Sequence, residues 1–327
     1  MESRRMNQTG GTVYYHKKRK LKKGVIYALI ALVIVIAAIF GGIRYYNLIN
    51  SYPYKLEKAG YNEKEITTIT KKLKDKEIDK LLEMKYNKLY DDFINEKYFM
   101  FKNLKTYIDY YTEDSDQTIT HAVAMVNVRA NEDHYTDVKQ TDTSKGELIL
   151  VNKYNQLPKD FAPKDLTDIS VQYCYGDNEV SNEVYQKYIS MYNAAKKEDL
   201  YLIITSAYRD YNFQDQLWNQ YAKSQGEEWA DSVAARAGHS EHQTGLTLDI
   251  VTYNSNMNEF ENTDEFKWLQ KHAHEYGFIM RYPKDKEDIT GYDYESWHYR
   301  YVGVETATKI HELGITYDEY YAYYLAD

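Results

Sequence analysis

The residues best suited to chemistry lie in three short segments of the sequence. Residues 240–249 read SEHQTGLTLD, residues 295–300 read ESWHYR, and residues 206–214 read SAYRDYNFQ. Together these segments supply two imidazoles, several carboxylates and two guanidinium groups. A metal centre that hydrolyses its substrate needs this set of groups.

A hydrolytic zinc site needs three protein ligands and one open position for water. It also needs a carboxylate that is not a ligand and can take the proton of the water, and a positive group near the developing oxyanion. His242 and His298 can supply imidazoles, and Asp249 can supply the third ligand. Glu295 is the candidate base, and Arg209, which follows a predicted buried strand, is the candidate positive group.

Asp249 is the most informative of these residues, because it interrupts an apolar strand. Residues 246–251 alternate as LTLDIV, which is typical of a strand, and Asp249 then shares a face with Thr247, away from Leu248 and Ile250. A buried carboxylate is costly unless it is paired or bound to a metal. The pattern therefore favours a metal-binding role for Asp249.

Other chemistries are less well supported. Two histidines and one carboxylate also suit a non-haem iron site, so another divalent metal is the closest competitor. The sequence has no P-loop, no Rossmann glycine cluster and no nucleophile elbow. Its single cysteine, Cys174, excludes an intramolecular disulfide framework and a cysteine-based zinc cage.

The predicted elements mix strands and helices without a regular βαβ repeat, which indicates an α+β fold. We expect strands at 120–128, 147–151, 202–205 and 246–251. We expect helices at 181–195, 213–224 and 264–276.

The sequence of residues 1–118 predicts a membrane anchor followed by short helices. Residues 24–43 carry no charge and are long enough to span a bilayer, and a basic run precedes them. The positive-inside rule then keeps residues 1–23 cytoplasmic and exports the rest; a cleaved signal peptide is the alternative. We expect a helical stalk or small helical domain at 44–118 and the catalytic domain at 119–327.

The charge distribution argues against a nucleic-acid partner. The net charge is −9, and eight of the 41 Lys and Arg residues precede residue 24. The remainder is strongly acidic, whereas binding to phosphates requires a basic face.

The three segments together resemble the zinc D-alanyl-D-alanine carboxypeptidase family of VanY type. Residues 240–249 are similar to its S-x-H-x-x-G-x-x-x-D motif, and residues 295–300 to its E-x-W-H-x-R motif. The resemblance extends over about residues 147–305. One departure is Ser296, which stands where many relatives have proline.

The resemblance implies a role for each matching residue. His242, Asp249 and His298 would hold Zn²⁺, Glu295 would be the general base, and Arg209 would bind the scissile carbonyl or its oxyanion. Further residues would contact the peptide substrate: Ser240, Gln214 and, more weakly, Tyr282.

The family also implies a fold and a substrate. The fold would be a central antiparallel sheet that carries the zinc site between flanking helices. The implied reaction is hydrolysis of the C-terminal D-Ala from a peptidoglycan stem peptide outside the membrane. An L,D-carboxypeptidase acting on the tetrapeptide, and a non-catalytic wall-binding protein, are the alternatives that we keep open.

Overall fold

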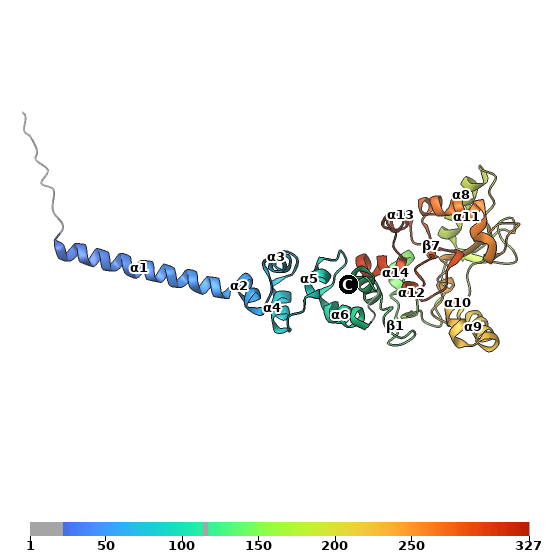
Figure 1. The fold of residues 1–327 in the computed structure, drawn as a ribbon. Coiled ribbons are helices and arrows are strands. Elements are labelled where there is room, and N and C mark those ends of the chain that lie inside the picture. The colour runs from blue at the N-terminus through green and yellow to red at the C-terminus, as the bar shows by residue number, and fades with distance from the viewer. Residues whose placement is uncertain (1–21, 114–116, 327) are drawn as a thin grey trace, which may run out of the picture. The chain divides into compact units, whose positions relative to one another are not determined.

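The computed structural model describes residues 22–113 and 117–326 (Figure 1). The predicted basic tail, residues 1–23, lies outside the described residues except for its last two. The chain divides into two compact units, residues 1–87 and residues 88–327, and each is described by itself.

From residue 22 on, where the structure describes it, the first unit consists of four helices. Their bounds are α1 (Lys23–Asn50), α2 (Tyr52–Ala59), α3 (Glu63–Lys72) and α4 (Asp75–Glu83). Asn62 begins α3 with a capping box, in which its side chain accepts from the backbone of Glu65 while the Glu65 carboxylate accepts from the backbone of Asn62. Leu56, Ile69 and Leu81 form the small buried interior of α2 to α4.

Helix α1 is apolar over most of its length and has no buried residue. By length and composition it can cross a membrane, and an N-terminal signal sequence has the same character.

The second unit mixes helices with short strands. Its helices are α5 (Leu89–Asn95), α6 (Leu104–Glu113), α7 (Ile119–Asn127), α8 (Asn182–Lys196), α9 (Tyr211–Gln225), α10 (Glu227–Val233), α11 (Asp264–His272), α12 (Glu287–Thr290), α13 (Val304–Leu313) and α14 (Tyr317–Tyr320). Short 3₁₀-helical segments are η1 (Phe101–Asn103), η2 (Thr143–Leu148), η3 (Glu241–Thr244), η4 (Met257–Asn262) and η5 (Ala273–Tyr276), and η6 (Tyr321–Leu325) is a short π-helix. The predicted domain boundary at residue 118 stays a prediction. The division into compact units falls earlier in the chain and places α5 to α7 in the same unit as the residues that follow them.

A four-stranded antiparallel sheet with the order β5-β6-β8-β7 forms the centre of this unit. Its strands are β5 (Ile203–Ser206), β6 (Thr247–Val251), β7 (Phe278–Tyr282) and β8 (Glu295–Tyr301). Two minor pairs complete the strands: β1 (Lys139–Gln140) with β2 (Asn155–Gln156), and β3 (Leu166–Asp168) with β4 (Glu179–Ser181). The predicted mixed fold is therefore correct, and the main sheet is antiparallel.

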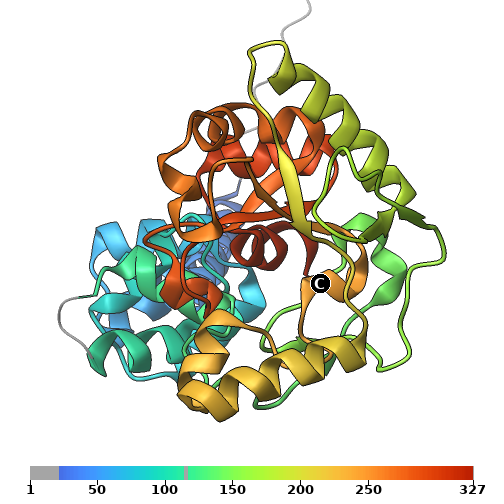
Figure 2. The same ribbon diagram turned by 90° about the vertical axis from the view of Figure 1, so that its right-hand side faces the viewer.

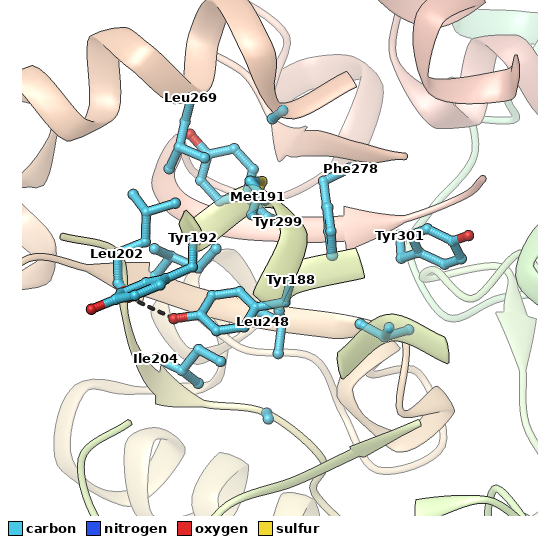
Figure 3. Close-up of a cluster of buried hydrophobic side chains, with 14 of the residues drawn as sticks. Tyr188, Met191, Tyr192, Leu202, Ile204, Leu248, Leu269, Phe278, Tyr299 and Tyr301 are labelled. Atoms are coloured by element: carbon cyan, nitrogen blue, oxygen red, sulfur yellow. Dashed lines mark hydrogen bonds between the residues drawn. The ribbon is translucent and has the colours of Figure 1, made fainter. Parts of the chain in front are cut away.

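One face of the sheet packs on the main hydrophobic core. Leu248 and Ile250 of β6 and Tyr299 of β8 contribute to it, together with residues of α8 and α11 (Figure 3). The Tyr188 hydroxyl of α8 donates to the backbone oxygen of Leu202 at 2.5 Å, which satisfies the one polar atom that this ring carries into the core.

Helices lie on both sides of the sheet, with α8 above the strands and α9 below them in both views (Figures 1 and 2). The period of two along β6 turns Thr247 and Asp249 away from the core, as predicted. That opposite face carries the polar residues considered below.

Two predicted strands are wrong. Residues 120–128 are almost entirely helical in α7, whose first turn is capped by the Thr118 side chain. A continuous apolar run fits a buried helix as well as a buried strand, and here Ala122 to Val126 are all buried in the helix. Residues 147–151 form no strand; η2 ends there, and the following residues are buried as irregular chain.

We expect Leu248→Ala to lower the free energy of unfolding of the second unit by about 2–5 kcal/mol, because Leu248 is completely buried on the core face of β6. Tryptophan fluorescence during urea unfolding would measure the change in detergent-solubilised full-length protein. The fluorescence signal reports on the second unit alone, since all four tryptophans belong to this unit.

Val171→Ala is the matched control, because Val171 is 81% exposed and its truncation should change stability by less than about 0.5 kcal/mol. Equal effects of the two substitutions would contradict the assignment of this face to the core.

Candidate metal centre

The three predicted metal ligands converge on one point. His242, Asp249 and His298 each offer one ligand atom, and these atoms all lie within 4.8 Å of one another. All three side chains are buried. Within the described residues, no other group of three histidine, cysteine or carboxylate side chains converges in this way.

Pairing within the sheet brings two of these residues together. Asp249 of β6 lies directly opposite His298 of β8, and on its other side opposite Ser206 of β5. His242 comes from η3, the turn that leads into β6. Gly245 ends that turn with a left-handed φ of +66°. A Cβ added to Gly245 would come within 2.8 Å of Pro163. Only glycine fits there without a shift.

The hydrogen bonds of His242 fix which nitrogen faces the site. Its Nδ1 lies 2.5 Å from the backbone oxygen of Ala207, which can only accept, so Nδ1 carries the proton. The other nitrogen, Nε2, is left as an acceptor 3.5 Å from Oδ2 of Asp249. A histidine that is anchored through one nitrogen in this way is oriented to bind a metal through the other.

Several buried polar atoms at this point have no hydrogen-bond partner. They include Nε2 of His242 and Oδ1 of Asp249. Buried atoms of this kind are costly to leave unpaired, and a shared cation would satisfy both. Two imidazoles and one carboxylate fit the three protein ligands of a catalytic zinc ion, whose fourth position is taken by water.

Glu295 lies beside this group, as the candidate base should. Its Oε2 is 3.0 Å from Nδ1 of His298, and the same nitrogen is 3.4 Å from Oδ1 of Asp249. Residues three apart in a regular strand point to opposite faces. The pairing of β7 with β8 is irregular between Met280 and Tyr282, the partner of Glu295, and such irregularities re-aim side chains.

Arg209 approaches the group from the loop after β5. Its Nη2 lies 4.0 Å from Oδ2 of Asp249, and its Nε is buried without a partner. The backbone nitrogen of Arg209 donates to the backbone oxygen of His242, so the loop is tied to η3. A guanidinium held in this position keeps unused donors for a further anionic or carbonyl oxygen.

The three predicted substrate contacts differ in the hydrogen bonds and packing contacts that their side chains already make. Gln214 donates to the backbone oxygen of Ala235 at 2.7 Å, which leaves its Oε1 buried and unpaired. The Ser240 hydroxyl accepts from the backbone nitrogen of His242 at 3.3 Å. The ring of Tyr282 lies 4.7 Å from that of His298, edge to face.

Burial and neighbouring charges shift the pKa values of the site in opposite directions. Burial, reinforced by the charge of Arg209, lowers the pKa of His242 to about 4. Burial also acts to lower the pKa of His298, but the carboxylates of Glu241, Glu295 and Asp249 outweigh it and raise that pKa to about 9.

The pKa values of the two carboxylates, Glu295 and Asp249, are also shifted in opposite directions. Burial raises the pKa of Glu295 above its ordinary value, against the opposing effect of His298. Burial would also raise the pKa of Asp249, but His242, His298 and Arg209 overcome this and lower it to about 2. Two neighbouring carboxyl groups with separated pKa values are typical of a pair in which one stays ionised and the other exchanges protons.

A buried ionic network that was not predicted from the sequence lies behind the site. Glu241 accepts from Arg281 at 2.8 Å and from Arg300 at 2.9 Å, and Arg281 also pairs with Asp318. The only sequence signal was that Glu241 stands inside the buried segment between Ser240 and His242. Arg281 and Asp318 are too far away in sequence for spacing to have revealed the pairing.

His239 is not a member of the metal group. Its Nδ1 lies 2.8 Å from the backbone oxygen of Asn152, and its ring packs edge to face on Tyr135. Although it is only three residues before His242, its contacts are those of a packing residue.

Comparison with known proteins identifies related sequences and structures. Residues 177–304 match the family model described as VanY: D-alanyl-D-alanine carboxypeptidase. YodJ of Bacillus subtilis (strain 168), a protein named as a carboxypeptidase, is 38% identical over 201 residues, covering 58% of this chain and 74% of that protein. A D-alanyl-D-alanine carboxypeptidase of Enterococcus faecalis (strain ATCC 700802 / V583) is 32% identical over 194 residues, covering 57% of this chain and 69% of that protein.

The fold also matches a solved structure. The LdcB LD-carboxypeptidase is 37% identical, covers 57% of this chain and 91% of its own, and superimposes with a TM-score of 0.54.

Binding of Zn²⁺ should release about one proton per ion at pH 7.5, because metal ligands bind unprotonated and His298, with its pKa near 9, carries a proton before the ion arrives. The affinity should therefore weaken as the pH falls from about 9 towards 7. Titration calorimetry of the full-length protein in two buffers with different ionisation enthalpies would measure the proton count. A count of zero would contradict this arrangement of charges.

Proposed function

This chain belongs to the VanY family of D-alanyl-D-alanine carboxypeptidases, and we propose that it is a membrane-anchored zinc enzyme that removes the C-terminal D-Ala from peptidoglycan stem peptides. The observation that carries the proposal is the convergence of His242, Asp249 and His298, with the carboxylate of Glu295 3.0 Å from His298. The three candidate ligands and the candidate base are all present in the chain, which disfavours a purely wall-binding role.

We propose that Zn²⁺ is held by Nε2 of His242, a carboxylate oxygen of Asp249 and Nδ1 of His298. When bound, the ion supplies Lewis-acid chemistry that acidifies water and stabilises negative charge. A two-His, one-carboxylate set can also hold iron. The free carboxylate of Glu295 beside the set favours hydrolysis over oxygen chemistry.

Glu295 is proposed as the proton carrier. Its raised pKa makes it a better base than an exposed glutamate, and it lies next to the ligand set without being one of its three members. It would take a proton from the attacking water and deliver it to the amine of the leaving D-Ala. No covalent acyl-enzyme is required, and no serine nucleophile is assigned.

Arg209 is proposed to bind the carbonyl oxygen of the scissile amide and the charge that develops on it. Its partly exposed guanidinium retains an unpaired Nε. Gln214, Ser240 and, more weakly, Tyr282 are proposed as contacts to the peptide, with the free Oε1 of Gln214 available to accept a peptide N–H.

The anchor would be helix α1, with the basic residues before it in the cytoplasm and the catalytic unit outside. This topology delivers the enzyme to a substrate that lies beyond the membrane. A lipid bilayer and the peptidoglycan stem peptide are thus the proposed partners, and no nucleic acid is expected.

A second specificity is supported by one observation. The solved structure that matches with a TM-score of 0.54 is an LD-carboxypeptidase, which makes the tetrapeptide an alternative substrate. Incubation of the full-length protein with purified pentapeptide and tetrapeptide muropeptides, followed by mass spectrometry, should show loss of one alanine from the pentapeptide only. Loss from the tetrapeptide alone would replace the proposed specificity with the alternative.

Glu295→Gln should lower kcat about 10²- to 10⁴-fold, since the amide cannot accept the proton of the water. It should leave zinc bound, because all three ligands remain. Release of D-Ala and metal content measured on the same sample would test both statements, with Glu305→Gln, an exposed glutamate at the start of α13, as the control. Activity at the control level in Glu295→Gln would refute the assigned base.

Removal of the metal should abolish D-Ala release, and stoichiometric Zn²⁺ should restore it. The measurement is an assay after dialysis against a chelator, followed by titration with zinc. Full activity in protein that contains no metal would refute the proposed chemistry.

A further inference from the structure

Glu241 is a buried carboxylate whose two oxygens have different surroundings. It lies in η3 between Ser240 and His242 and is 1% exposed. Its Oε1 accepts from Nε of Arg281 at 2.8 Å and from Nη1 of Arg300 at 2.9 Å. Its Oε2 is buried and has no hydrogen-bond partner.

The unpaired oxygen of Glu241 faces an unpaired nitrogen of His298. The distance from Oε2 to Nε2 is 3.9 Å, and Nε2 of His298 is also buried without a partner. A hydrogen-bond acceptor and a hydrogen-bond donor, each without a partner, therefore face each other. A shift of about 1 Å would bring them to hydrogen-bond distance.

We propose that Glu241 is a positioning residue for the metal ligand His298. Its Oε2 accepts a hydrogen bond from the N–H at Nε2, which fixes the tautomer in which Nδ1 presents its lone pair to the ion. This inference rests on the proposed function, because it assumes that Nδ1 of His298 is a ligand. A carboxylate that accepts from the far nitrogen of a ligand histidine orients the ring and makes it a stronger base.

The surrounding charges explain why Glu241 can remain ionised in this position. Burial alone would raise its pKa, but Arg281 and Arg300 overcome this and hold the pKa well below its ordinary range. Arg281 is in turn neutralised by Asp318 of α14. Arg300 also donates to the backbone oxygens of Glu147 and Ile149. The two guanidinium groups therefore fix Oε1 and leave Oε2 directed at His298.

The test compares Glu241→Gln with Asp318→Asn in the full-length protein. Each substitution removes one negative charge from the same buried network, but only Glu241 faces His298. We expect Glu241→Gln to weaken Zn²⁺ binding about 10- to 100-fold in a chelator competition assay. Asp318→Asn should lower the melting temperature of the metal-free protein and change zinc affinity less than about threefold.

The absorption spectrum of the Co²⁺-substituted protein gives a second readout that general destabilisation does not move. It should shift in Glu241→Gln and match the wild type in Asp318→Asn. Zinc affinity and a Co²⁺ spectrum in Glu241→Gln equal to those of the wild type would overturn the inference.

Loss of folding in Glu241→Gln would not end the test. The double variant Glu241→Gln with Arg300→Met restores charge balance, and its zinc affinity should be weakened to the same degree. If the wild type itself binds no zinc, the proposed function fails. If the wild type binds zinc and both Glu241 variants bind it equally well, only the role of Glu241 fails.

Discussion

The pairing of Asp249 with His298 across β6 and β8 is the constraint on which the rest of the site depends. It places an ionised carboxylate in the interior of a domain, one residue from the completely buried Leu248. Such a carboxylate is stable only with positive charge around it. His242, Arg209 and, in the proposed function, a metal ion supply that charge from one side of the sheet. The apolar side of the same two strands holds them in register through Leu248 and Tyr299.

The polar face of the sheet is arranged as two successive layers. The first layer contains the three ligand candidates, Glu295 and Arg209. Behind them lies the network of Glu241, Arg281, Arg300 and Asp318, in which two guanidinium groups balance two carboxylates. Buried ionic groups that balance one another contribute little net stability, yet each one is costly to leave alone. The network therefore restricts η3, β7, β8 and α14 to one relative arrangement.

Much of the front layer could be predicted from the sequence, because its residues lie in short motifs whose spacing follows from local structure. Alternation along β6 was enough to place Asp249 opposite the core. The proximity of Glu295 to His298 depends on an irregular strand pairing, which no periodicity encodes. The partners of Glu241 come from positions 281, 300 and 318, and only the folded chain shows that they meet. The apolar run at 120–128 was assigned to a strand because length and hydrophobicity do not separate a short buried helix from a strand.

The long sequence separation within the ionic network bears on the order in which the protein folds. Residue 318 leaves the ribosome later than residue 241. Until Asp318 is available, Arg281 lacks one of its two carboxylate partners. If Arg281 were buried before Asp318 is available, the positive charge of its guanidinium would be only partly neutralised. The second unit should therefore keep this side of its sheet open to water until α14 docks, so that the face with the candidate metal centre is among the last parts of this unit to close.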